Sequence, residues 1–237
     1  MQSSSSEFQI TEVASFPIGL GYQDSSIVKL VFKPTSPGDK VADITITSNS
    51  SVNPAYIVKA AGKGFVINPV TAQTIYGAAG TFDNGNIVSL NRTTGTATLI
   101  GASGFSQLTG LSIMPSTNFL FGSISSSPNS QLVCVNASGG DAYVYANIPV
   151  GNVRAITFDL NDDFYFATIS GLLYKFSLST NDTTFVGNTS ISNLYGLSIN
   201  PLNGQLWGVS LTGATYKINK SNGSSTSVGT AGTGLIA

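Results

Sequence analysis

Three residues downstream of residue 64 have side chains that suit ligand recognition: Asp83, Arg154 and Tyr195. Arg154 is one of only two arginines in the chain, and a guanidinium binds a carboxylate or a sulfate through two parallel hydrogen bonds. Arg154 and Tyr195 stand at matching positions of a repeated pattern, just before a predicted strand, where Thr109 stands in another copy. We therefore name Asp83, Arg154 and Tyr195 as candidate ligand-binding residues.

Each of these candidates also has a purely structural interpretation. Asp83 begins the run Asp83-Asn84-Gly85-Asn86, and Asn-Gly is a strong signal for a hairpin turn. For Arg154 the structural interpretation is a loop arginine that donates to a backbone carbonyl. The sequence favours the structural interpretation of both residues and leaves ligand binding as the alternative.

The densest acidic cluster is the run Asp159-Leu160-Asn161-Asp162-Asp163. Carboxylates at this spacing suit a calcium ion, but the distal glutamate of a full calcium loop is absent. The cluster aligns with Met114-Pro115-Ser116-Thr117-Asn118 and with Asn200-Pro201-Leu202-Asn203-Gly204, which are typical of turns between strands. The favoured interpretation is a structural turn.

Four aromatic residues recur at spacings of 45, 45 and 41 residues: Tyr76, Phe121, Phe166 and Trp207. A row of aromatic rings can stack against sugars. Each of these four is followed by a small residue inside a predicted strand, which favours packing between repeats. We interpret them as core residues.

The residue types that most catalytic and metal sites need are scarce. There is no histidine, which excludes a Ser-His-Asp or Cys-His catalytic unit and an imidazole-bound metal. The single cysteine, Cys134, cannot form an intramolecular disulfide or a thiolate cage. We expect no catalytic residue, no metal and no cofactor.

Charge and hydropathy limit the partners. The chain has 10 Lys+Arg against 11 Asp+Glu, a net charge of −1, so it has no electrostatic footprint for nucleic acid. No stretch approaches the roughly 18 consecutive apolar residues of a membrane span, so we expect no membrane insertion. A glycan or a protein remains as the expected ligand.

The elements that must position these side chains are strands. Hydrophobic residues make up 41% of the chain, which is enough for a core, and the composition favours Thr, Val, Ile, Tyr and Phe. Helix formers at a 3.6-residue period are nearly absent. We expect an all-β fold.

From Gly64 onward the chain repeats itself. The first predicted strand of each repeat contains Gly64-Phe65-Val66-Ile67-Asn68-Pro69, Gly110-Leu111-Ser112-Ile113-Met114-Pro115, Ala155-Ile156-Thr157-Phe158-Asp159-Leu160 or Gly196-Leu197-Ser198-Ile199-Asn200-Pro201. Each is followed by three further predicted strands, as in Phe166-Ala167, Leu173-Tyr174-Lys175-Phe176-Ser177 and Phe185-Val186-Gly187. Four short strands in 41–45 residues are the period and strand count of a β-propeller blade. The predicted blades cover residues 64–109, 110–154, 155–195 and 196–237.

These repeats resemble secreted bacterial β-propellers, loosely akin to the YVTN and quinoprotein-like superfamilies. In a propeller, the connections between the second and third strands and between successive blades lie on one face. That geometry directs Asp83, Arg154 and Tyr195 toward one opening. We expect the four blades to form an open arc cut from a larger propeller, and we expect the array to be a fragment.

Residues 1–63 are predicted to form a separate domain. Apolar and polar residues alternate in 27–33, 40–47 and 55–60, between turns rich in Pro, Gly and Asn. The run Val31-Phe32-Lys33-Pro34-Thr35, followed by Ala42-Asp43-Ile44-Thr45-Ile46-Thr47 and Ala61-Gly62-Lys63-Gly64, resembles the C-terminal half of an ASPM/SPD-2/hydin-type Ig-like domain, also known as choice-of-anchor D. The resemblance implies a partial Ig-like β-sandwich.

Three functions are compatible with these observations. The leading one is a non-catalytic bacterial module for adhesion or binding, outside the cell or on its surface, with a signal peptide on sequence that precedes Met1. The second is part of a propeller enzyme, a quinoprotein-like oxidoreductase or a polysaccharide lyase or hydrolase, whose site lies in missing sequence. The third is a structural spacer. Fold analogy alone does not choose among them.

Overall fold

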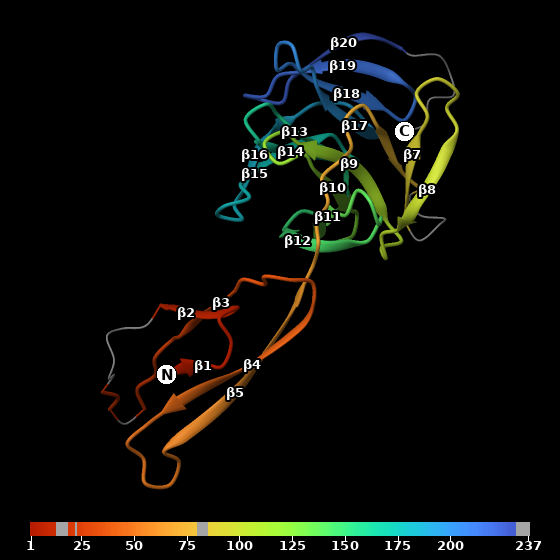
Figure 1. Cartoon of the computed structure of the whole chain (residues 1–237). Coiled ribbons are helices and arrows are strands. Elements are labelled where there is room, and N and C mark those ends of the chain that lie inside the picture. The colour runs from red at the N-terminus through yellow and green to blue at the C-terminus, as the bar shows by residue number, and fades with distance from the viewer. Residues whose placement is uncertain (13–18, 22, 80–84, 231–237) are drawn as a thin grey trace. The chain divides into compact units, whose positions relative to one another are not determined.

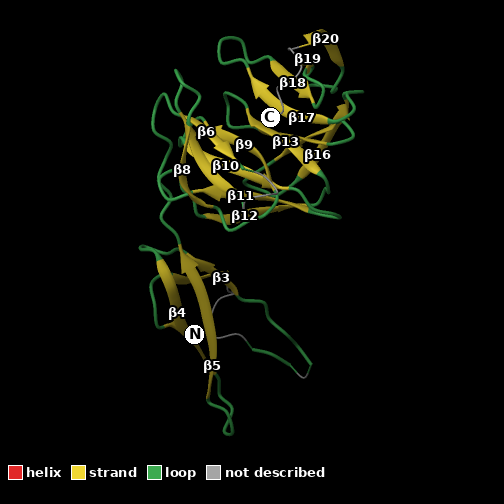
Figure 2. Cartoon of the chain, turned by 90° about the vertical axis from the view of Figure 1, so that its right-hand side faces the viewer, coloured by secondary structure: helices red, strands yellow, loops and turns green. Residues whose placement is uncertain are grey.

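The computed structural model contains strands and loops over all the residues that it describes, which are 1–12, 19–21, 23–79 and 85–230 (Figures 1 and 2). The expected all-β fold class is confirmed. The chain divides into two compact units, Met1–Val66 and Ile67–Ala237. No helix long and apolar enough to span a membrane is present in the described part of the chain.

The first unit contains a three-stranded sheet and a two-stranded ribbon. The sheet has the order β1-β4-β5, and its strands are β1 (Gln2–Ser3), β4 (Gly38–Thr47) and β5 (Ala55–Gly64). The ribbon pairs β2 (Phe8–Glu12) with β3 (Lys29–Phe32). Phe8, Ala42 and Ile44 form the small core, and the rings of Phe8 and Phe32 stack with centroids 4.6 Å apart. The Ig-like assignment of this unit stays a prediction.

The second unit contains four antiparallel sheets in chain order. The first has three strands: β6 (Ile75–Ala78), β7 (Asn86–Leu90) and β8 (Ala97–Ala102). The second has β9 (Leu108–Met114), β10 (Phe119–Ile124), β11 (Ser130–Val135) and β12 (Ala142–Ile148). The third has β13 (Val153–Phe158), β14 (Phe164–Thr168), β15 (Leu172–Phe176) and β16 (Thr183–Asn188). The fourth has β17 (Leu194–Ile199), β18 (Leu206–Ser210), β19 (Ala214–Ile218) and β20 (Ser225–Thr230).

The first strands of the four-stranded sheets lie side by side, β9 beside β13 and β13 beside β17, so they are the innermost strands of the array. Each four-stranded sheet is a simple meander of neighbouring strands, as in a propeller blade. We number the sheets as repeats one to four.

The predicted first strand of repeat one, at residues 64–69, is wrong. Gly64 is the last residue of β5, where it pairs with Gly38, and residues 65–70 are not in a strand. Further along this segment, the Asn68 carbonyl accepts a hydrogen bond from the Ala137 amide at 3.3 Å, and the Val70 amide donates to the Asn118 carbonyl at 2.8 Å, so both residues are bonded to the second repeat. Gly64, which the repeat pattern assigns to the array, is therefore part of the β4–β5 hairpin of the first unit.

A hydrophobic cluster fills the space between each pair of neighbouring repeats. Repeats one and two share the cluster around Ile87, Leu108 and Leu120. Repeats two and three share a phenylalanine-rich cluster that also buries Cys134. Repeats three and four share the cluster around Leu173, Leu194 and Leu206. The cores between repeats position the innermost strands.

The strand register shows that one residue of the predicted aromatic series was assigned to the wrong position. Phe121 pairs with Cys134 and Trp207 pairs with Lys217, and the residue in this position of repeat three is Tyr165, paired with Lys175. Phe166 is therefore one residue out of phase, because the connection before β14 is one residue shorter than its counterparts. Phe121 and Phe166 are both buried, which confirms their assignment to the core.

The turn between the third and fourth strands has the same backbone hydrogen bonds in every repeat. Its fifth residue adopts a positive φ in each copy, at Gly95, Gly140, Asn181 and Gly223. In two copies this residue lies directly against a glycine in the fourth strand of the preceding repeat, Gly140 against Gly101 and Gly223 against Gly187. The turn of one repeat thus packs on the fourth strand of the preceding repeat at a glycine, where no side chain intervenes, and this contact recurs between repeats.

Candidate ligand-binding site on the innermost strands

A β-bulge occurs at the same position in the innermost strand of repeats two, three and four. The strand register shifts at Thr109 in β9, at Arg154 in β13 and at Tyr195 in β17. A bulge leaves one residue outside the ladder pairing and redirects its side chain. The residues that the sequence aligned are therefore the extra residues of three equivalent bulges.

The bulges of neighbouring repeats are in contact. The Thr109 hydroxyl donates to the Val153 carbonyl at 3.2 Å and lies at the same distance from the Ser123 carbonyl and hydroxyl. Val153 directly precedes Arg154, so the first bulge is fixed against the second. This arrangement orders the three positions as a row across adjacent strands.

Arg154 and Tyr195 are brought together by this row. The guanidinium carbon of Arg154 lies 5.7 Å from the centroid of the Tyr195 ring, which is within the range of a cation–π interaction. Both side chains are only partly buried. The tyrosine ring therefore lies beside the guanidinium, and the Arg154 side chain as a whole stays partly exposed.

Arg154 has no anionic partner in the part of the chain that the structure describes. No carboxylate lies within ion-pair distance of its guanidinium, and its Nε is buried without a hydrogen-bond acceptor. The alternative in which Arg154 donates to a backbone carbonyl is not found among the described residues. Among the residues that the structure describes, the Arg154 guanidinium is therefore left without a counterion.

Asp83, the third candidate, lies outside the described residues, so its place relative to Arg154 stays a prediction. The turn interpretation of this segment is untested for the same reason. Asn86 and Gly85 adjoin it in the described chain, and Gly85 has a positive φ of 64°.

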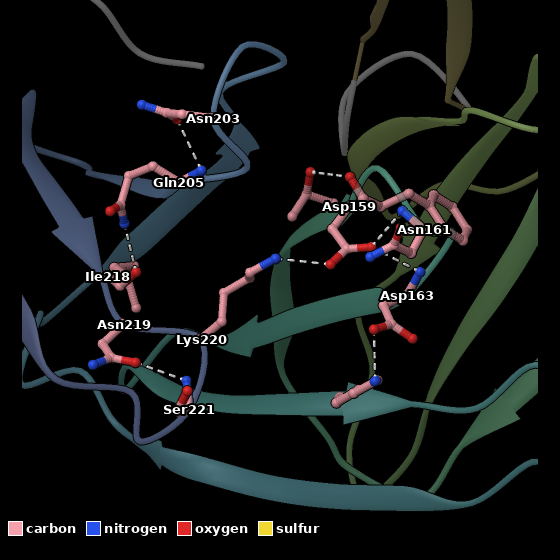
Figure 3. A network of polar contacts seen from close by, with 12 residues as sticks. Asp159, Asn161, Asp163, Asn203, Gln205, Ile218, Asn219, Lys220 and Ser221 are labelled. Atoms are coloured by element: carbon pink, nitrogen blue, oxygen red, sulfur yellow. Dashed lines mark hydrogen bonds and ion pairs between the residues drawn. The ribbon is translucent and has the colours of Figure 1, made fainter.

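The acidic cluster at 159–163 forms a polar network, shown in Figure 3. The Asp159 carboxylate is almost fully buried and accepts hydrogen bonds from Lys220 Nζ at 2.8 Å, the Asn161 amide at 2.9 Å and the Asp163 amide at 3.1 Å. Asp163 pairs with Lys175 at 2.7 Å. These contacts confirm the turn interpretation, because the carboxylates accept hydrogen bonds from, and form ion pairs with, groups of the chain itself.

Lys220 belongs to repeat four and Asp159 to repeat three, so their ion pair connects two repeats. Lys220 Nζ also lies 5.8 Å from the centroid of the Tyr165 ring. The sequence analysis did not identify this pair. The two residues are 61 positions apart, and no short-range pattern marks one as the partner of the other.

Replacing Lys220 by methionine is expected to lower the free energy of unfolding by about 2–3 kcal/mol, because it leaves the buried Asp159 charge without its counterion. Methionine keeps most of the aliphatic stem. The matched control is Lys175→Met, whose pair with Asp163 is 41% and 37% exposed and should contribute less than about 1 kcal/mol. Urea unfolding of both variants measures the difference, and equal losses would contradict the assignment.

Acid should remove the contribution of Asp159 to stability. Burial raises the pKa of the Asp159 carboxyl, but the hydrogen bonds from Lys220, Asn161 and Asp163 lower it more, so that the net pKa lies below its ordinary value. The unfolded chain therefore binds this proton at a higher pH than the folded chain, and protonation favours unfolding. We expect the contribution to be complete above about pH 4 and to be lost as the pH falls through the lowered folded-state pKa.

The measurement is urea unfolding at a series of pH values for the wild type and for Asp159→Asn, which cannot titrate. We expect the stability of the wild type to fall more steeply at acid pH than that of the variant. Parallel curves for the two proteins would show that Asp159 is not a source of the acid sensitivity.

The comparisons with known proteins address the fold. No protein-family model matches the chain, and no curated protein matches it. Among solved structures, a chain of the nidogen/laminin complex aligns with a TM-score of 0.51 and 12% identity, over 78% of this chain and 72% of that one. A gluconolactonase from Xanthomonas campestris aligns with a TM-score of 0.50 and 15% identity, over 69% of this chain and 61% of that one. At these identities the likeness shows the fold alone: the chain has a β-propeller-like fold built of repeated blades, and no family is assigned.

Proposed function

We propose that this chain is a non-catalytic binding module that holds an anionic ligand against its innermost strands through Arg154 and Tyr195. The observation that carries the proposal is the Arg154 guanidinium, which has no ion-pair partner among the described residues and lies 5.7 Å from the centroid of the Tyr195 ring. A partly buried cation without a counterion is more stable with an anion bound.

The favoured ligand is a glycan that bears a carboxylate or a sulfate. The forked donors of Arg154 match either group, because both present two oxygens in one plane. The neighbouring bulge residues, Thr109 and Tyr195, are uncharged, and Tyr195 offers a hydroxyl group, which suits sugar hydroxyls; the Thr109 hydroxyl already donates within the chain. An acidic protein loop would use Arg154 but has less use for the Tyr195 hydroxyl, so it is the second choice.

We also propose that the module works outside the cell or on its surface. The support is the low content of charged residues, 9%, and the resemblance of the repeats to secreted bacterial propellers. A rigid array that presents one row of recognition residues suits adhesion, since binding there needs no chemical step.

The test is calorimetric titration of the chain with three oligosaccharides of similar length: one carboxylated, one sulfated and one neutral. We expect the carboxylated or the sulfated sugar to bind, and the neutral one to show no measurable heat. We expect the affinity to fall as salt is added, because the main contact is ionic. Equal binding of the neutral sugar, or no binding of either acidic sugar, would contradict the proposal.

A further inference from the structure

Every repeat of the array has two different faces. We call the face that packs on the preceding repeat the leading face, and the face that the following repeat covers the trailing face. The strand register assigns Ile75, Leu120, Phe164 and Leu206 to the leading faces of repeats one to four. It assigns Tyr76, Phe121, Tyr165 and Trp207 to the trailing faces in the same order.

Inside the array, most positions of the two faces are closed, although Tyr76 on the trailing face of repeat one is only partly buried. On the leading faces, Leu120 is 1% exposed, and Phe164 and Leu206 are fully buried. On the trailing faces, Phe121 is 2% and Tyr165 is 6% exposed. The contact is completed by the turn of the following repeat, which lies on a strand glycine: Gly140 on Gly101, and Gly223 on Gly187.

The leading face of repeat one is open. Ile75 is 46% exposed, although its equivalents in the other three repeats are buried. Its turn has the same backbone hydrogen bonds as the other turns, from Asn91 to Thr96. Gly95, the fifth residue of that turn, would bring a Cβ near no atom within 4 Å. This turn therefore has the shape that docks on a strand glycine, but no strand of the described residues lies beneath it.

Among the described residues, the trailing face of repeat four is open as well. Trp207 is only partly buried, like its equivalent Tyr76 and unlike Phe121 and Tyr165. Val228 is 53% exposed, whereas its equivalent Val186 packs against the cluster between repeats three and four; the equivalent residue of repeat two, Tyr145, is 48% exposed. Gly229 stands where Gly101 and Gly187 receive a turn, and a Cβ added there would meet nothing within 4 Å.

The two open faces are the two halves of one contact, and we infer that a second copy of this chain joins them. The trailing face of one copy, with Trp207, Val228 and Gly229, receives the leading face of the other copy, with Ile75 and the turn that contains Gly95. If both ends are joined in this way, two copies are related by a two-fold axis and each contact is used twice. The four repeats of each copy then form a ring of about eight blades, which is within the range of known propellers.

A second copy fits these faces because the chain itself supplies both halves. Each half reproduces the backbone geometry of a contact that is already made between Gly140 and Gly101 and between Gly223 and Gly187. An unrelated partner would need to imitate a repeat. Head-to-tail joining also covers exposed apolar residues at both ends at once, which is the favourable term in association.

The test combines the solution mass with the fluorescence of Trp207, the only tryptophan in the chain. At about 100 μM, far above the Kd of a stable dimer, we expect light scattering after size exclusion to give twice the 24.5 kDa of one chain. We expect acrylamide to quench Trp207 weakly in this state and several-fold more strongly after dilution, when the trailing face opens.

The variant Gly229→Val fills the place of the docking turn without a clash inside one chain, so it should be monomeric, with Trp207 readily quenched. The matched control is Gly19→Val, since Gly19 also has nothing within 4 Å but lies outside the array; it should remain a dimer. A wild-type monomer at the high concentration would overturn the inference. A dimer that survives Gly229→Val, or one in which Trp207 stays fully accessible, would overturn it too.

Discussion

Replacing Gly187 by alanine is expected to destabilise the second unit by about 3 kcal/mol, which is a large effect for the addition of one methyl group. The new Cβ would fall on the backbone carbonyl of Asn222, in the turn of the next repeat. Neither backbone can move freely, because Gly187 pairs with Leu173 in the strand ladder and the turn is closed by its own hydrogen bonds. The repeats must separate to accommodate the methyl group.

Gly77→Ala is the matched control for this variant. There the added Cβ would lie 3.2 Å from Cγ2 of Val88, a side-chain atom that can shift slightly, so the cost should be less than about 1 kcal/mol. Denaturant unfolding of Gly187→Ala, Gly77→Ala and the wild type measures both values. Equal stabilities of the two variants would show that the turn does not depend on a bare strand backbone.

Replacing Arg154 by glutamine is expected to weaken the binding of an acidic oligosaccharide by roughly 30-fold to 100-fold, which corresponds to about 2–3 kcal/mol for a charge-assisted contact. The fold should keep its stability, because Arg154 makes no ion pair with a described residue and its Nε has no acceptor. Calorimetric titration gives the affinity, and urea unfolding gives the stability of the same sample.

Three further variants separate the effect of charge from the effect of geometry. Arg154→Lys keeps the charge but loses the planar fork, so it should recover only part of the affinity. Tyr195→Phe keeps the ring beside the guanidinium but removes the hydroxyl offered to the sugar, so it should bind less tightly than the wild type and more tightly than Tyr195→Leu, which loses both. If Arg154→Gln binds as tightly as the wild type, the ligand does not use this site.

Much of the array could be predicted from the sequence because the repeats are local. The first-strand alignment placed Thr109, Arg154 and Tyr195 at one position, and the structure places all three in equivalent bulges. The bulges themselves were not foreseen, since a period-2 pattern does not show which residue leaves the ladder.

The errors have physical causes that lie outside one repeat. The assignment of residues 64–69 to the array failed because Gly64 pairs with Gly38 in the first unit, a competition that the repeat pattern does not contain. Phe166 was taken for the equivalent of Phe121 because the shorter connection before β14 changes the register by one residue. A slip of one residue exchanges the two faces of a strand.

The most direct test of the proposed function is a crystal structure of the chain grown with the acidic oligosaccharide at a concentration that saturates the titration. We expect the ligand on the innermost strands, with its carboxylate or sulfate oxygens within hydrogen-bond distance of the Arg154 guanidinium and beside the Tyr195 ring. A ligand bound on any other surface, with Arg154 left without an anion, would contradict the account.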